Sequence, residues 1–234
     1  MRVYVLQHAE PETPGTIADV LGERGVAMDT VRTYAGEPVP SSLEGRDGLV
    51  VMGGPMGVYE ADRHPYLRNE IRLIQDAVAR ELPVLGVCLG SQLLAAALGA
   101  NVTPARKEIG WYPVTLTEEA SRDPLLRDLD PSFEVFHWHG DAFELAPGAV
   151  SLATSERTER QAFRYGPAAY GFLFHMEMTE SMVRAMVESF GGEVVEAGGS
   201  AAEILARAPQ GVRAMRKRAG IVFRRWADLL EPKD

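Results

Sequence analysis

Short apolar runs alternate with helical segments along the first half of the chain, and this alternation is the strongest constraint on its fold. Gly48–Met52 and Pro83–Val87 are wholly apolar runs with the length of buried strands. Between them, apolar residues recur every three or four positions over Pro65–Leu82, which is the spacing of one helix face. Strand, helix and strand in this order predict parallel strands joined by crossover helices. We therefore predict an α/β fold with three layers, in which helices flank an open, mostly parallel sheet.

The rest of the chain adds strands and helices without a break that would mark a second domain. Further strands are predicted at Arg2–Gln7, Met28–Tyr34, Glu108–Thr117, Phe133–His137, Ala149–Ala153, Gln161–Tyr165 and Ala169–His175. Further helices are predicted at Thr16–Arg24, Gly90–Leu98, Ser181–Phe190, Ala201–Ala208 and Val212–Leu230. The Gly-rich stretch Gly191–Gly199 is predicted to be a short linker. We expect residues 1–234 to form one domain, with the last helices covering the sheet.

Charge and composition argue against several kinds of partner and site. The chain has 33 acidic and 24 basic residues and a net charge of −9, whereas binding to a nucleic-acid backbone needs a basic face. We find no apolar run long enough to span a membrane and no secretory leader, so we expect a cytoplasmic protein that does not contact membranes. A single cysteine can form neither an internal disulfide nor a metal site of several thiolates.

That cysteine, Cys88, lies where an apolar strand gives way to a helix, in the segment LGVCLGSQ. A lone cysteine is either a buried small hydrophobic residue or a nucleophile. A strand, a nucleophile and a helix in immediate succession form a sharp elbow, and Gly86 and Gly90 would relieve clashes there. The helix N-terminus would favour a thiolate, and the N–H of Leu89 would point to a developing oxyanion. The elbow pattern favours the nucleophile.

A cysteine nucleophile needs a base, and His175 is the best placed of the five histidines. It ends the predicted strand Ala169–His175, and Glu177 stands two residues later, where both side chains of a strand would share one face. The run GGPMG follows another predicted strand. It is either a simple turn or a loop whose Gly54 N–H completes an oxyanion hole with Leu89. Both motifs follow strand ends, where the catalytic groups of open α/β sheets collect.

Together, GGPMG, GVCLGSQ and His-x-Glu resemble the class I glutamine amidotransferases, above all the glutaminase domain of GMP synthase and its free-standing relatives. The resemblance covers about residues 48–180 and implies the family's flavodoxin-like fold. It implies that a triad of Cys88, His175 and Glu177 hydrolyses the glutamine side-chain amide through a γ-glutamyl thioester and releases ammonia. It also implies that the substrate is bound by Gln92, Trp138, His139 and Gly140. Neither a metal nor a cofactor is expected.

Several functions stay open at this stage. GMP synthases usually carry Ser where this chain has Trp138, and Pro where it has Met176, so specificity for glutamine is an open point. The chain shows no ATP-pyrophosphatase loop and no P-loop, so we expect no use of ATP. A free-standing amidotransferase would deliver ammonia to a separate synthetase or other acceptor enzyme. The same triad could instead hydrolyse γ-glutamyl peptides or amides, and a third alternative is a catalytically silent binding module.

Overall fold

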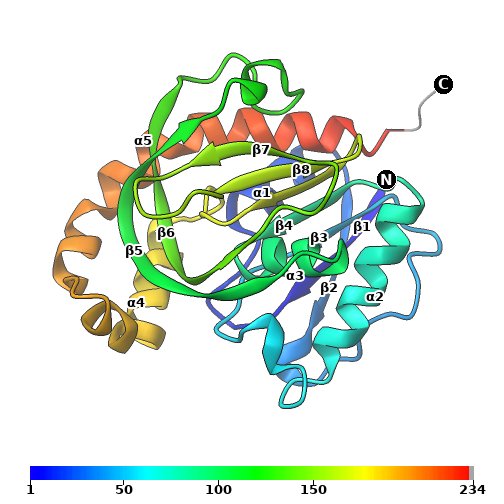
Figure 1. Ribbon diagram of the computed structural model, residues 1–234, viewed down its shortest axis with the longest axis horizontal. Coiled ribbons are helices and arrows are strands. Elements are labelled where there is room, and N and C mark those ends of the chain that lie inside the picture. Colours follow the sequence, from blue (N-terminus) through cyan, green and yellow to red (C-terminus); the bar gives the residue numbers. More distant parts are fainter. Residues whose placement is uncertain (232–234) are drawn as a thin grey trace.

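The computed structural model describes residues 1–231 and, within them, shows a nine-stranded sheet between layers of helices (Figure 1). The strands are β1 (Arg2–Gln7), β2 (Ala27–Arg32), β3 (Gly48–Val51), β4 (Val84–Val87), β5 (Val102–Leu116), β6 (Ser132–Phe143), β7 (Ala149–Thr154), β8 (Ala162–Tyr165) and β9 (Ala169–Phe172). The helices are α1 (Gly15–Glu23), α2 (Tyr66–Ala79), α3 (Leu89–Ala97), α4 (Glu180–Glu196) and α5 (Ala201–Asp228). Short 3₁₀ turns lie at Thr33–Ala35, Val58–Glu60 and Glu119–Arg122.

The sheet has the order β2-β1-β3-β4-β9-β8-β7-β5-β6. Its first five strands, β2 to β9, pair in parallel, as the alternation of apolar runs and helices predicted. The remaining strands pair antiparallel and complete the same sheet. Figure 1 shows β5 and β6 as long curved arms at one end of the sheet. Both strands are longer than predicted. The additional residues of β6 include Trp138, whose carbonyl lies beside Cys88 at the end of β4.

Helices cover both faces of the sheet, which gives the predicted three layers. On one face α1 and α5 pack against strands and against each other, with Ile17 and Trp226 fully buried. On the other face α2 and α3 form a second core with Ile74 and Leu93. Because β3 and β4 are covered on both sides, all of their residues are buried, which explains their unbroken apolar runs.

Two predictions about the C-terminal helices are wrong. The predicted linker Gly191–Gly199 is helical as far as Glu196, since α4 runs on through its glycines after a non-helical residue at Phe190. The two predicted helices after it are one helix, α5, with Pro209 inside. Proline removes one helix hydrogen bond and costs about 3 kcal/mol in a helix interior. Apolar residues of α5 are buried on both sides of Pro209, and their packing against the core offsets this cost.

None of the helices in the described residues is both long enough and apolar enough to cross a membrane.

Candidate active site

Cys88 occupies a strained elbow between β4 and α3. Its backbone lies at φ 50° and ψ −111°, a conformation that favours glycine. A Cβ on Gly86 would lie 2.4 Å from the carbonyl oxygen of Gly90, and one on Gly90 would lie 2.0 Å from that of Val51. Both contacts are with backbone, which cannot move aside. The elbow therefore depends on glycine at both positions, as the sequence predicted.

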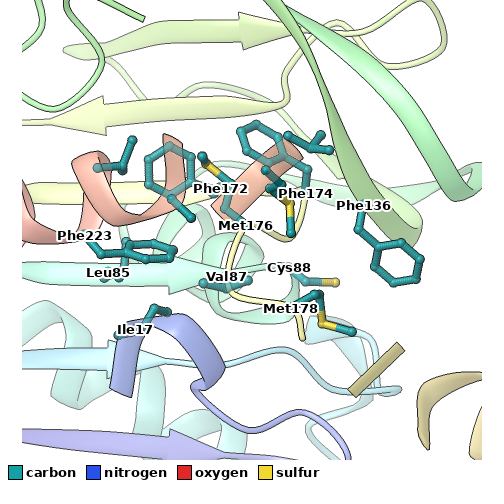
Figure 2. Packing of buried hydrophobic residues seen from close by; sticks show 14 of the residues in the cluster. Ile17, Leu85, Val87, Cys88, Phe136, Phe172, Phe174, Met176, Met178 and Phe223 are labelled. Carbon is teal, nitrogen blue, oxygen red and sulfur yellow. The ribbon is translucent and has the colours of Figure 1, made fainter. Parts of the chain in front are cut away.

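The thiol of Cys88 is nearly buried, with the residue 6% exposed. Its Sγ donates a hydrogen bond to the backbone carbonyl of Trp138, at 3.4 Å. Figure 2 shows its side chain beyond Leu85 and Val87, pointing toward Phe136. Burial raises the pKa of the thiol, whereas the nearby imidazole of His175 and the N–H of Leu89 act to lower it. The thiol is thus held where an imidazole and a backbone N–H both favour its ionised form.

His175 and Glu177 form a buried pair, with 2.6 Å between the imidazole Nδ1 and the carboxylate Oε1. Burial alone would lower the pKa of His175, but the charge of Glu177, the neighbouring thiol of Cys88 and the hydrogen bond to Glu177 raise it well above its usual value. The imidazole Nε2 has no hydrogen-bond partner in the described chain. Glu177 thus orients the ring through Nδ1, and Nε2 is left unpaired within residues 1–231.

The predicted strand Ala169–His175 is too long, because β9 ends at Phe172. His175 lies beyond it and is held instead by its own N–H, which donates to the carbonyl of Phe136 at 2.8 Å. The prediction that His175 and Glu177 share one face of a strand is therefore wrong, although their side chains do meet. The backbone of Glu177 is fixed from α1, since Thr16 N–H donates to its carbonyl at 2.9 Å.

The glycine loop after β3 is held by a second buried pair. His8 Nε2 lies 2.8 Å from Glu70 Oε2, and His8 Nδ1 lies 3.0 Å from the carbonyl oxygen of Gly53. Glu70 raises the pKa of His8 against the effect of burial. A Cβ on Gly54 would come within 3 Å of His8 and Leu89 side-chain atoms, so only glycine fits. This arrangement places the Gly54 backbone beside the elbow.

A cavity of about 490 Å³ opens over Cys88. Its lining includes all four residues that the sequence assigned to the substrate, namely Gln92, Trp138, His139 and Gly140, and also Gly54. The elbow, the glycine loop and the arm of β6 thus surround one space. The cavity is also lined by residues of the β1–α1 loop and of α4, which the sequence motifs did not indicate.

Comparison with known proteins decides the family. The family model for class-I glutamine amidotransferases matches residues 15–194, which is most of the chain. The chain belongs to this family.

Among relatives of this amidotransferase, the glutamine amidotransferase-like protein YfeJ of Salmonella typhimurium is 40% identical over 203 residues, which are 85% of each chain. A subunit of the glutamine-hydrolysing GMP synthase of Methanosarcina barkeri is 34% identical over 161 residues, or 68% of this chain and 79% of that one. A solved glutamine amidotransferase from Methylobacillus flagellatus superposes with a TM-score of 0.90 at 32% identity, covering all of this chain and 96% of the other. The predicted family and fold are confirmed.

Glu12 is one of the cavity residues that the sequence motifs did not indicate. It is 5% exposed, no hydrogen bond to its side chain is found in the described structure, and it lines the cavity beside Cys88. Burial raises its pKa to about 7, although the charges of His175 and His8 act to lower it. Its position in the loop after β1 could have indicated Glu12, because ligands of open α/β sheets bind where the strand order reverses. In this sheet the reversal lies between β1 and β3.

A second buried cluster consists of Glu108, His137 and His139, of which His139 also lines the cavity. Its possible ligand atoms all lie within 4.8 Å of one another, so these residues could hold a metal ion. Glu108 Oε2 already accepts hydrogen bonds from three side chains, those of Ser155, Thr158 and Gln161. Burial acts to raise the pKa of Glu108, but the two histidines and the hydrogen bond from Ser155 lower it to about 2. Burial lowers the pKa of His137 to about 3. An ionised carboxylate beside a neutral imidazole supports the strand that carries His139.

Proposed function

We propose that this amidotransferase hydrolyses γ-glutamyl amides, with glutamine as the simplest substrate and Cys88 as nucleophile. One observation carries the proposal. The strained Cys88 lines the cavity and lies beside the buried imidazole of His175, whose Nε2 is unpartnered in the described chain and whose Nδ1 is bonded to Glu177. A nucleophile, a base and an orienting carboxylate in this relation are the requirements of thiol acyl transfer. Membership of the amidotransferase family supports the same chemistry.

In the first half of the reaction, Cys88 passes its proton to His175 and the thiolate attacks the side-chain carbonyl carbon of the substrate. The negative charge that develops on the carbonyl oxygen is stabilised by the backbone N–H groups of Gly54 and Leu89. His175 then returns the proton to the departing nitrogen, the C–N bond breaks, and ammonia leaves. The product on the enzyme is a γ-glutamyl thioester. Glu177 stabilises the imidazolium at each transfer.

In the second half, His175 takes a proton from water, and the resulting hydroxide attacks the thioester carbonyl. The same two N–H groups stabilise the second oxyanion. The C–S bond breaks, glutamate leaves, and the proton returns to the sulfur. Gln92, Trp138, His139 and Gly140 hold the glutamyl part, which is consistent with their place in the cavity lining.

The released ammonia would pass to a separate acceptor enzyme. The name of the Methanosarcina barkeri relative supports this part of the proposal, because it describes one component of a glutamine-hydrolysing GMP synthase. The acceptor would be an ATP-dependent synthetase, and the chain itself would supply the glutaminase step. Stimulation of glutamine hydrolysis by the acceptor would be its signature.

The test is glutamate release from glutamine by the purified protein and by Cys88→Ala. The variant should keep the wild-type melting curve within a few degrees and lose about a thousandfold or more in kcat. A glutamine-analogue electrophile should label the wild-type chain at Cys88, as mapped by peptide mass spectrometry. Undiminished hydrolysis by the variant, or labelling at another residue, would refute the assignment of Cys88.

A further inference from the structure

We propose that the same site cleaves γ-glutamyl amides whose amine part is a positively charged alkylamine, such as the mono-γ-glutamyl amide of a diamine, because the carboxylate of Glu12 lies beside His175 and Glu193 lines the same cavity. This inference rests on the proposed γ-glutamyl hydrolysis. It names the class of leaving group that the chain accepts beyond ammonia.

The size of the cavity is the first reason. Its volume is about 490 Å³, within the range of sites that hold whole small-molecule ligands. Ammonia is about the size of a water molecule, whose share of liquid volume is ~30 Å³. The glutamyl part and ammonia would leave much of this space filled with solvent. A longer amine would occupy it.

The position of Glu12 is the second reason. The departing nitrogen takes its proton from His175, so it must lie beside that imidazole. Glu12 flanks the same ring. A Cβ built on Gly53 would lie 1.8 Å from Glu12 Oε2 and 3.3 Å from His175 Cε1, so the carboxylate and the imidazole meet over this one glycine. The carboxylate is therefore on the side from which the amine departs.

The state of Glu12 is the third reason. A buried carboxylate is normally paired or hydrogen-bonded, because desolvation of an isolated charge is costly. Glu12 is 5% exposed, its carboxylate keeps contact with the cavity space, and no side-chain hydrogen bond to it is found within residues 1–231. An ammonium group in the cavity would supply the missing partner and favour the ionised form. A neutral or anionic amine part would not.

The charge of the surrounding wall points the same way. Glu60, Asp141 and Glu193 also line the cavity. Among the described lining residues Lys107 is the one lysine or arginine, and its Nζ is taken by Glu196 at 2.6 Å and Glu193 at 3.7 Å. Acidic groups therefore exceed basic ones, and the potential attracts cations.

Part of the cavity wall is apolar. Met186 and Phe190 of α4 line the cavity together with Glu193 from the same helix. A methylene chain can pack against a thioether and an aromatic ring while its terminal ammonium reaches a carboxylate. This combination fits an alkyl diamine better than a polar or acidic leaving group.

The reaction balances as a hydrolysis. The thiolate of Cys88 displaces the amine nitrogen, which takes the proton held by His175 and leaves as the free diamine. Water then cleaves the thioester to glutamate. The reaction needs no oxidant, reductant or further co-reactant.

The test compares three substrates that share the glutamyl part and differ in the charge of the amine part: the γ-glutamyl amides of 1,4-diaminobutane, butylamine and 4-aminobutyrate. We expect kcat/KM to be about tenfold or more higher for the cationic amide than for the neutral one, from the usual strength of a bond to a charged group. The anionic amide should be poorer still. The preference should shrink as salt is added, since ions screen the cavity charge.

Amino-acid substitutions test whether Glu12 and Glu193 cause the preference for the cationic amide. Glu12→Gln and Glu193→Gln should each reduce the ratio of kcat/KM for the cationic amide to that for the neutral amide. Glu188→Gln removes the same charge from α4 outside the cavity lining and should leave the ratio unchanged. Because the readout is a ratio within one variant, a general loss of activity does not mimic the result.

The outcomes separate the two proposals. If glutamine is hydrolysed at Cys88 but the three amides react equally, or the neutral one reacts best, the inference about the leaving group is overturned and the proposed function stands. If the cationic preference survives both Glu12→Gln and Glu193→Gln, the assignment to these carboxylates is overturned. If neither glutamine nor any γ-glutamyl amide is hydrolysed, the proposed function fails and the inference fails with it.

Discussion

The strain at Cys88 can be measured by comparing glycine and alanine at this position. With φ at 50° and ψ at −111°, the residue lies close to the first central position of a type II′ turn, which glycine dominates. A residue with a Cβ held in such a region stores about 1–3 kcal/mol. Cys88→Gly releases this strain and Cys88→Ala retains it. Both variants lack the sulfur, so their difference reports the Cβ alone.

Two opposing effects set the expected magnitude. Replacing a buried alanine by glycine within a helix costs about 1 kcal/mol in propensity and a further ~0.8 kcal/mol for the buried methyl group. Ala219, fully buried within α5, provides the control for an unstrained position. We therefore expect Ala219→Gly to destabilise the protein by about 2 kcal/mol. At position 88 the released strain should cancel most of that cost, which leaves the glycine and alanine variants within about 1 kcal/mol of each other.

Urea unfolding at one pH gives the free energies directly. Thermal melting checks them, since 1 kcal/mol shifts the melting temperature of a chain of this size by about 2–4 °C. The Ala219→Gly change is best made in the Cys88→Ala background, so that each comparison starts from one protein. If alanine-to-glycine costs the same at both positions, the backbone at the elbow is not strained, and the physical basis for a nucleophile there is lost.

Two further predictions concern the charges around the cavity. Glu177→Gln removes the charge that raises the pKa of His175, so kcat for glutamine should fall about a hundredfold or more. Steady-state kinetics test this prediction. A kcat close to the wild-type value would show that Glu177 does not stabilise the imidazolium. Glu12 has its pKa raised from 4.5 to about 7, so the stability it contributes is full below pH ~4.5 and is lost as the pH rises to about 7. Between pH ~4.5 and about 7, the free energy of unfolding of Glu12→Gln should therefore rise relative to that of the wild type, by up to about 3 kcal/mol as measured by urea unfolding. A difference that does not change with pH would mean that Glu12 ionises like an exposed carboxylate.

The elbow could be predicted from sequence because its determinants are local. The apolar strand, Cys88 and the small residues that follow occupy consecutive positions. Glycine at 86 is needed because of the Gly90 backbone in the same segment, whereas glycine at 90 is needed because of the Val51 backbone in the neighbouring strand β3. The family resemblance added the residues of β6, whose positions depend on a strand that lies far away in the sequence. In the folded chain these side chains line the cavity with Cys88.

Local signals failed where packing sets the structure. Nothing in the sequence around Pro209 predicts that one helix runs through a proline, because the buried face of α5 supplies the compensation. The end of β9 at Phe172 was also missed. The apolar run continues to Phe174, and this pattern is the same for residues buried in a strand and residues buried in the loop after it.

Glu12 and His8 belong to a third category, in which strand order decides. They stand in a polar stretch that carries no motif, and they become part of the site because β1 lies between β2 and β3. That order brings the loop after β1 against the loop after β3, so that His8 bonds Gly53 and Glu12 lies against the same glycine. The strand order, rather than the spacing of residues, determines which carboxylates face the nucleophile.

The same carboxylate links stability to specificity. In the free protein Glu12 is an unpartnered acid in a buried position, and its ionisation opposes folding above pH ~4.5. A cationic leaving group would pair with it, so the free energy lost by burying the charge is regained only when such a ligand is bound. Neutral glutamine leaves the carboxylate without that partner on the amine side. Discrimination between amines would then arise from an interaction that the empty cavity lacks, which is how a site with a buried unpaired group rejects ligands that cannot satisfy it.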